Sequence, residues 1–342
     1  MKKLLSSLLV LAALGLAMVP SAVAQVAVSD HSVAMPRMSF YKYSGFNSTA
    51  FTADNPAAIS WLDKSQIGAG FLSHQVLDDE PDAVAPAIAP PQRKFSSDGL
   101  YFGGRLVGEA MGFAAGHIEL NRNEPDYLLQ ERNSEAQFSF KMNQLLSFGL
   151  GFSSISRTDE VYDSTVPQFV NNTMAISRRT IGVSLKMGDV FYLGAAAHRD
   201  KGAARDVTNG LSQNGDRAVT LAGFAIRSTG KMRWFMAVDQ MEYKAFSFQN
   251  GTLDPNSFKV TNVTLQGRDD EILLGFSQQN FVTEDKNDEI VAQSMNFGYK
   301  PYGTFVFGVG GTVSTHKNKV TNPADLVDIA YTNIGVSLGF EF

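Results

Sequence analysis

The sequence predicts an all-β protein that closes as a transmembrane antiparallel β-barrel of about 14 strands, with a plug segment inside its lumen. Three observations carry this prediction. From residue 65 onward, apolar residues alternate with small or polar ones in segments of about ten residues, the length of a tilted membrane strand. The connections between these segments alternate between short and long. Only 18% of the residues are charged, although the chain contains 25 Phe and 30 Gly.

Residues 1–24 have the pattern of a secretory signal peptide. Lys2 and Lys3 form a charged start, an apolar run follows, and Ala22-Val23-Ala24 is a small-x-small cleavage site. The sequence contains no Cys, which excludes disulfides, thiolate metal sites and a lipidated cysteine. We therefore expect an exported protein, and the apolar strands that follow place it in the bacterial outer membrane.

Residues 25–64 do not alternate like strands, and we expect them to form an N-terminal hatch, or plug. Asn55 is a good helix N-cap and Pro56 suits the first helical position, so residues 57–62 can continue for a turn or two. Such a short helix must bury its apolar side chains somewhere. The residues predicted to hold the hatch in the lumen are Asn55, Pro56, Ala57, Ile59, Trp61 and Leu62.

Residues 65–342 are predicted to form the barrel. Between positions 146 and 153, Leu and Phe alternate with Ser and Gly, so one face is oily and the other small or polar. Short turns are expected near residues 108–110, 143–144, 188–189, 229–230, 267–268 and 301–303. Long loops are expected at 76–98, 122–133, 158–173, 200–215, 245–257, 282–289 and 316–327. Both chain ends then lie on the side of the short turns, which requires an even number of strands.

Two soluble folds also alternate, and the sequence argues against both. The open face of a β-sandwich should carry more charge than Gly, Ser and Ala provide. A β-propeller should show an internal repeat, and the sequence has none.

Catalytic and metal sites have little support in the sequence. The five His show no metal-ligand spacing, and there is no Gly-x-Ser-x-Gly motif. We expect no catalytic residues, no metal and no cofactor; the acidic run at 284–289 could hold Ca²⁺ but reads better as a solvated loop. The net charge of −5 argues against a nucleic-acid partner.

The third predicted strand, residues 111–121, is the candidate ligand path. Phe113, Ala115 and His117 are candidate lumen-lining residues, and Gly112 and Gly116 mark a candidate bulge or bend. Close packing of these glycines against a plug is an equally good reading. The loop at 76–98 contains an apolar, Pro-rich segment that could capture a greasy ligand outside the cell or serve as a stiff linker.

Taken with Asn55-Pro56-Ala57 ahead of fourteen strands, the chain resembles the FadL-type outer-membrane transporters of long-chain fatty acids and other hydrophobic compounds. The resemblance implies a monomeric barrel in contact with outer-membrane lipids. A hydrophobic ligand would pass by diffusion and leave sideways through a gap made by a kinked third strand, at Gly112 and Gly116. The terminal Phe342 resembles the aromatic residue that such barrels present to their assembly machinery.

Two other functions stay open. A non-transporting barrel of the same fold could act as a secretion or surface-assembly partner. An outer-membrane enzyme would require a Ser or Asp beside His117 or His198 at the membrane rim.

Overall fold

The structure, a computed structural model, describes residues 52–78, 93–124, 127–163, 168–206, 211–229, 233–244, 247–248, 257–286, 288–301, 303–318 and 328–342. The predicted signal peptide, the first part of the predicted hatch (25–51) and the apolar part of the 76–98 loop lie outside these residues.

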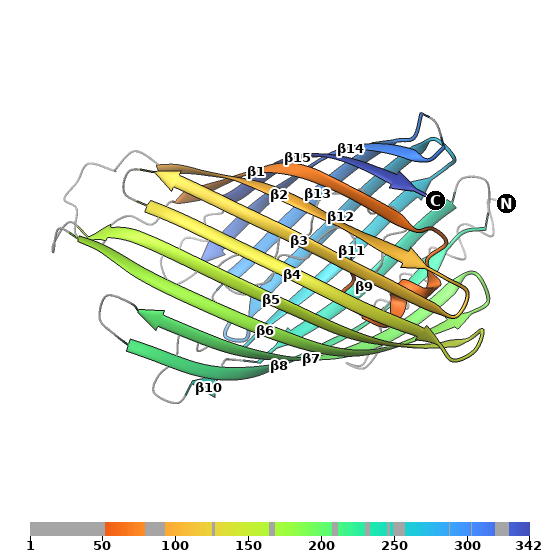
Figure 1. Cartoon of the computed structure of the whole chain (residues 1–342), viewed down its shortest axis with the longest axis horizontal. Helices are drawn as coiled ribbons and strands as arrows, with labels where there is room; N and C mark the ends of the chain where they lie inside the picture. Colours follow the sequence, from red (N-terminus) through yellow and green to blue (C-terminus); the bar gives the residue numbers. More distant parts are fainter. Residues whose placement is uncertain are drawn as a thin grey trace.

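The described strands form one closed antiparallel barrel (Figure 1). Consecutive strands pair along the sheet, β8 also pairs with β9, and β1 pairs with β15 to close the ring. Of fifteen strands, β10 has only two residues and pairs with β8 alone, so fourteen make the wall and the predicted number is confirmed. The strands are β1 (Gln66–Asp78), β2 (Arg93–Val107), β3 (Met111–Glu124), β4 (Tyr127–Lys141), β5 (Leu146–Asp163), β6 (Gln168–Met187), β7 (Phe191–Asp206), β8 (Leu211–Arg227), β9 (Arg233–Tyr243), β10 (Ser247–Phe248), β11 (Phe258–Arg268), β12 (Ile272–Thr283), β13 (Asp288–Tyr299), β14 (Phe305–Asn318) and β15 (Asp328–Glu341).

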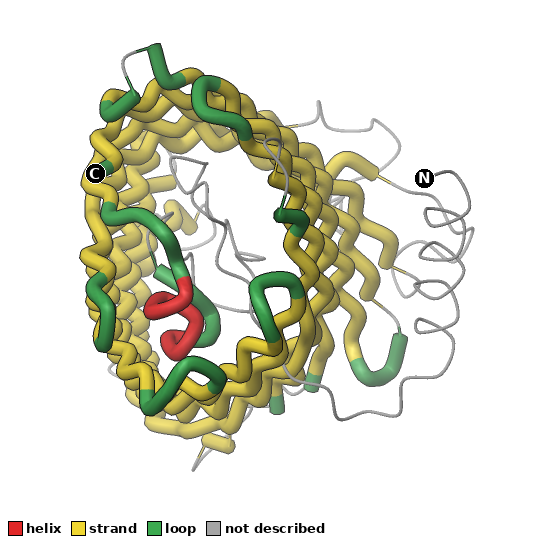
Figure 2. The backbone as a smooth tube through the Cα atoms, turned by 90° about the vertical axis from the view of Figure 1, so that its right-hand side faces the viewer, coloured by secondary structure: helices red, strands yellow, loops and turns green. Residues whose placement is uncertain are grey.

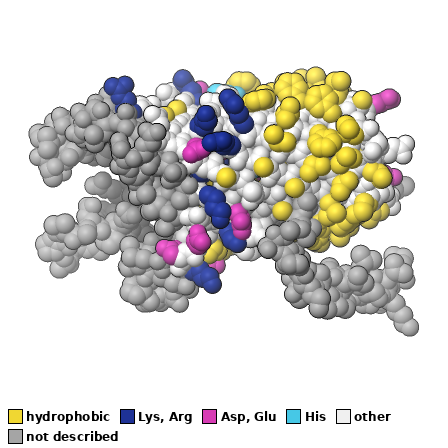
Figure 3. Space-filling model, turned by 90° about the horizontal axis from the view of Figure 1, so that it is seen from below, with side chains coloured by type: hydrophobic (Ala, Val, Ile, Leu, Met, Phe, Trp, Pro, Cys, Tyr) yellow, Lys and Arg dark blue, Asp and Glu magenta, His cyan; other side chains and the backbone are white. Residues whose placement is uncertain are grey.

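The period-2 alternation separates an oily outer face from a small or polar inner face. On β5, Phe148, Leu150 and Phe152 point outward and are 41–51% exposed, whereas Ser147, the residue before Phe148, points inward and is fully buried. Outward apolar side chains gather in a band over the half of the barrel that carries the short turns (Figure 3). A closed wall with such a band satisfies its backbone hydrogen bonds internally and suits hydrocarbon rather than water. Among the described residues, no helix is both long and apolar enough to cross a membrane.

The short turns lie where they were predicted, with one small shift, but several predicted loops are strand. Gly188 and Gly303 have positive φ and allow two of the tight turns. The turn predicted at 267–268 lies at 269–271, because β11 continues to Arg268. On the other side, β3 and β4 are separated by residues 125–126 rather than by a loop over 122–133, and β5 and β6 by residues 164–167. These strands of 14 to 20 residues exceed the nine to eleven that a bilayer needs, so the wall continues beyond the membrane on this side.

The one helix among the described residues, the short 3₁₀-helix η1 (Pro56–Trp61), lies inside the ring of strands near the short turns (Figure 2). It packs against one side of the inner wall, chiefly β4, β5 and β6. All six of its residues are buried. The helical part of the plug predicted from the sequence therefore lies inside the barrel.

Candidate functional site

The fold of the hatch follows from its first two residues. The side-chain oxygen of Asn55 accepts a hydrogen bond from the Ala57 N–H (3.1 Å), as an N-cap does. Pro56 occupies the first helical position, where its missing N–H costs nothing. The helix ends when the Leu62 N–H donates to the Ile59 carbonyl (3.2 Å). This short helix places Ile59, Trp61 and Leu62 in one apolar cluster with residues of the barrel wall.

Three glycines of the wall, Gly112, Gly149 and Gly182, lie directly against the hatch. A Cβ added at Gly149 would overlap the backbone at Pro56 and Ala57, and one at Gly182 would overlap the Asn55 side chain. A Cβ at Gly112 would lie 2.9 Å from the Ile59 Cγ2 atom. A larger residue at Gly149 would push the backbone of the hatch away, whereas one at Gly182 or Gly112 would first displace the side chain of Asn55 or Ile59.

Gly112 therefore serves close packing, one of the two readings that its sequence context allowed. The pairing of β3 gives no support to the other reading, a bend or lateral opening at Gly112 and Gly116. β3 pairs with β2 up to Gly112 and with β4 over its whole length, and neither ladder contains a register shift. Gly116 itself has a partner on each side, Gly103 and Glu135.

The predicted lumen lining on β3 is wrong, because Phe113, Ala115 and His117 lie on the outer face. The Phe113 ring contacts that of Phe138, and the His117 ring that of Phe102, which are both exposed on the outside. The inner face of β3 carries the small alternate residues instead, and Ala114 packs in the apolar cluster of the hatch. Small residues face inward here because the hatch occupies the space.

Polar contacts hold the hatch to three strands. The Gln137 side chain on β4 accepts from the Ala53 N–H (2.8 Å) and donates to the Ala53 carbonyl (2.6 Å). On β5, the Ser147 hydroxyl donates to the Ala57 carbonyl (2.8 Å). On β6, the Val183 carbonyl accepts from Asn55 (2.9 Å), and the Ser184 hydroxyl accepts from the Trp61 indole (3.2 Å). These bonds satisfy backbone and indole groups that would otherwise be buried without partners.

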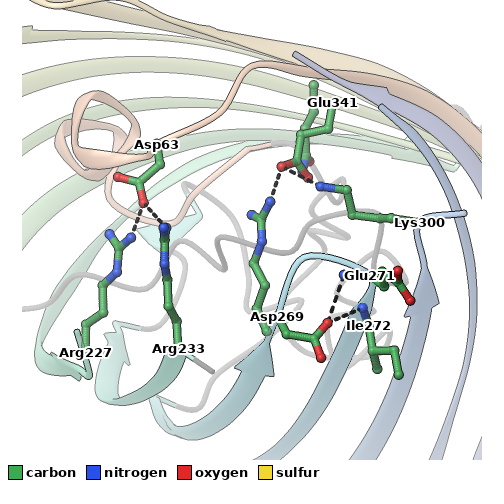
Figure 4. A network of polar contacts seen from close by, with 10 residues as sticks. Asp63, Arg227, Arg233, Asp269, Glu271, Ile272, Lys300 and Glu341 are labelled. Carbon is green, nitrogen blue, oxygen red and sulfur yellow. Dashed lines mark hydrogen bonds and ion pairs between the residues drawn. The ribbon is translucent and has the colours of Figure 1, made fainter. Parts of the chain in front are cut away.

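An ionic latch ties the end of the hatch to a different part of the wall. Asp63 pairs with Arg227 at the end of β8 and with Arg233 at the start of β9, the latter at 3.1 Å (Figure 4). Burial alone would raise the pKa of Asp63, but the hydrogen bond from Arg227 and the charges of both arginines hold that pKa below its ordinary value. The hatch thus spans from β4–β6 to the β8–β9 turn.

A second carboxylate at the same end closes the seam between the first and last strands. Glu341 on β15 is buried and accepts from Arg268, from Lys300 (3.1 Å) and from Gln66 (3.2 Å) (Figure 4). Backbone bonds in both directions between Ser65 and Phe342 extend the same pairing. The terminal residue is therefore part of the closed wall.

Beyond the hatch, the inner wall carries an apolar strip across β7, β8, β9, β11, β12 and β13. Its residues are Ala196, Val219, Leu221, Met241, Tyr243, Phe258, Val260, Phe281, Ile290 and Ala292. On β8 and β9, Ala225, Phe235 and Ala237 lie on the same inner face and belong to the cluster of the hatch. One inward position on each strand, Gly223 on β8 and Asp239 on β9, separates the strip from the cluster of the hatch.

A buried charged cluster borders this strip. Asp200 on β7 accepts from Arg178 on β6 (2.7 Å) and from Arg217 on β8 (2.9 Å). The Arg217 guanidinium lies 4.9 Å from the centre of the Tyr243 ring. Tyr243 belongs to the apolar strip, so the charged cluster and the strip meet at its ring.

Among the described side chains, neither His117 nor His198 lies in a Ser–His–carboxylate arrangement. On the outer face, His117 Nδ1 lies 2.8 Å from the Ser134 hydroxyl, so a Ser does lie beside His117, as an outer-membrane enzyme would require. The nearby carboxylate that could orient the ring, Glu119, is instead engaged by Arg132 (3.1 Å). His198 is buried inside the barrel, where its partner is Thr180 (2.8 Å). Within the described residues, no group of three His, Asp or Glu is placed to hold a metal ion.

Comparison with solved structures places the fold. No protein-family model and no curated protein matches the sequence. The toluene transporter TodX of Pseudomonas putida is similar at a TM-score of 0.53 and 12% identity, over 93% of this chain and 99% of that one. A Pseudomonas aeruginosa FadL homologue is similar at 0.52 and 13%, over 94% and 99%. A mutant of TodX, described as a monoaromatic hydrocarbon channel, reaches 0.57 at 12%, over 84% and 92%. The resemblance to FadL-type barrels is thus confirmed at the level of the fold, which is that of bacterial outer-membrane proteins.

Proposed function

We propose that the chain is a passive outer-membrane channel for hydrophobic small molecules and that its hatch, predicted to start at residue 25, is the gate. The observation that carries this proposal is a pair of apolar clusters inside the barrel, the strip that includes Phe258 and Phe281 and the cluster of the hatch that includes Ile59 and Trp61. The inside of a water-filled porin is polar, so apolar clusters of this size favour a hydrophobic ligand. The solved structures of this fold described as toluene transporters and hydrocarbon channels support the same substrate class.

The wall residues are buried in this state, so passage requires movement of what covers them. The hatch is the described segment that can move without opening the barrel, because no β-ladder includes it. Its polar tethers are few, and each contributes on the order of 1 kcal/mol. Since the ladders of β3 are continuous, the proposed route runs along the lumen and past the hatch rather than sideways through the wall.

One feature of the inner wall favours a fatty acid as the transported ligand. The Arg178–Asp200–Arg217 cluster meets the apolar strip at Tyr243, so a carboxylate whose alkyl chain lies on the strip would have guanidinium donors beside it. An uncharged hydrocarbon would use the strip alone. Uptake of labelled oleate and of labelled toluene separates these two ligands.

The test is uptake by vesicles that contain the purified protein. Replacing Leu221 by Asn puts an amide into the apolar strip, and we expect uptake of the transported probe to fall at least tenfold. Thr220→Asn is the matched control, because Thr220 is the next residue on β8, points outward and faces Glu242 on β9. Folding of both variants is checked by heat-modifiable migration on gels. Equal uptake by Leu221→Asn and Thr220→Asn, or wild-type uptake no greater than that of empty vesicles, would contradict the proposal.

A further inference from the structure

The outer wall carries a group of cations that transport does not use. Arg179 on β6 and Arg199, Lys201 and Arg205 on β7 all point outward and are exposed. We call these four residues the cation patch. Seen from the side of β6–β8, Lys and Arg side chains form a stripe between the apolar band and the loop end of the barrel (Figure 3).

The patch begins where the apolar band ends. On β6, Met187, Leu185 and Ile181 point outward and are 41–65% exposed, and Arg179 is the next outward residue after Ile181. On β5, Phe152 pairs with Arg179 and is 51% exposed. The four cations therefore start at the height where the hydrocarbon of the outer leaflet gives way to its headgroups.

The patch has more positive charge than the described protein neutralises. Arg199 pairs with Asp216 at 2.5 Å. Within the described part of the chain, no carboxylate contacts Arg179, Lys201 or Arg205. Moreover, Arg179 and Arg199 are register partners, directly opposite each other on neighbouring strands. Like charges so placed destabilise a strand pair, and an anion bound between them would remove this cost.

A hollow lies beside the cations. It is lined by small residues, including Ser154, Ala175, Ser177 and Ala203, and by the charged side chains of Arg199, Lys201 and Asp216. Its volume is about 740 Å³, within the range of sites for small molecules. Hydroxyl groups and two cations in one lining suit a phosphorylated sugar, which offers hydrogen-bonding groups and a charge together.

We propose that the cation patch and this hollow bind the phosphorylated sugar headgroup of a glycolipid in the outer leaflet. The acyl chains of that lipid would lie on the apolar band at Phe152 and Ile181, while its phosphates bridge Arg179 and Arg199. Charge complementarity and position favour this occupant. An acidic protein surface would supply the charge, but it would not account for an apolar band directly below the cations.

The test measures binding of diphosphoryl lipid A to the full-length mature protein in detergent. Wild-type protein is expected to bind it at least tenfold more tightly than dephosphorylated lipid A, and more tightly than inorganic phosphate. Arg179→Ser/Lys201→Ser/Arg205→Ser should lose this preference. The matched control is Arg132→Ser/Lys259→Ser, because these outward cations are each paired with a carboxylate, Glu119 and Glu242 respectively. The control should bind within about twofold of wild type.

Heat-modifiable migration on gels reports whether each variant is folded. If the triple variant fails to fold, Arg179→Gln alone replaces it, with an expected loss of lipid A affinity of about fivefold. Equal binding of lipid A by the patch variant and wild type would overturn the proposal. So would equal affinity for lipid A and inorganic phosphate, which indicates a simple anion site. Preferential binding of an acidic peptide over lipid A would overturn it as well, in favour of a protein partner.

Discussion

Replacing Gly149 by Ala should unseat the hatch. The new Cβ would lie 2.7 Å from the Ala57 Cα and closer still to the Ala57 nitrogen and the Pro56 carbonyl carbon. These are backbone atoms, so no side-chain rotation relieves the overlap. Overpacking of this kind costs about 1–3 kcal/mol. A cost of about 2 kcal/mol raises the ratio of undocked to docked hatch about 30-fold.

The assay uses a single buried thiol, which is clean because the sequence has no Cys. Ala58 on the hatch is 1% exposed, so an Ala58→Cys reporter reacts with a maleimide only when the hatch leaves its site. The labelling rate should rise about 30-fold when Gly149→Ala is added. The control is Gly275→Ala on β12, where the nearest heavy atom would lie 3.5 Å from the new Cβ, an ordinary contact. Equal labelling rates in the two backgrounds would refute the reasoning.

Three further changes test the tethers of the hatch. Asp63→Asn removes the ionic latch. The Asp63 side chain is 39% exposed, so the latch contributes only about 1 kcal/mol. The substitution should therefore raise the labelling rate of Ala58→Cys about fivefold at neutral pH. Because the pKa of Asp63 is lowered in the folded state, the latch is complete above the unfolded pKa of about 3.9 and is lost as the pH falls through the lower folded pKa. Channel openings of the wild-type protein in planar bilayers should therefore increase below about pH 4. The same increase in an Asp63→Asn variant would count against the latch. Gln137→Ala leaves the Ala53 N–H and carbonyl without their partner at a cost of about 1–3 kcal/mol, so labelling should increase between about 5-fold and 160-fold. An unchanged rate would show that this contact does not hold the hatch. Asn55→Gly/Pro56→Gly removes the cap and its bond to Val183, and expressing cells should become more sensitive to bulky hydrophobic antibiotics; unchanged sensitivity at equal expression would argue against the hatch as a barrier.

The wall of the barrel was predictable because its signal is local. Alternation along β5 defines which residues face the membrane and which face inward, and the cap at Asn55 identifies the one segment that departs from it. The same rule misled the prediction for β3. There, Gly112, Ala114 and Gly116 are small because the inner face is crowded, yet glycines in a strand are equally consistent with a bend.

The contacts that hold the hatch could not be predicted from the sequence. Gln137 lies 84 positions from Ala53, and Arg227 lies 164 positions from Asp63. No local pattern links such pairs, since each partner is an ordinary polar residue in its own strand or turn. Lys141, Lys186 and Arg233 show the same limit: in the sequence they are merely basic residues in strands, and only the closed barrel brings Lys141 and Lys186 over the Trp61 ring (5.6 and 5.9 Å) and Arg233 to Asp63.

The most direct test of the gate is to lock the hatch to the wall with a reversible disulfide. A Cβ at Gly112 would lie 2.9 Å from the Ile59 Cγ2 atom, so the two Cβ atoms can be at most about 4.4 Å apart, within disulfide range. In vesicles containing Gly112→Cys/Ile59→Cys protein, uptake of the transported probe, toluene or oleate, should stop on oxidation and return on reduction, while each single-Cys variant stays unaffected. Undiminished uptake with the disulfide fully formed would contradict the claim that the hatch must move.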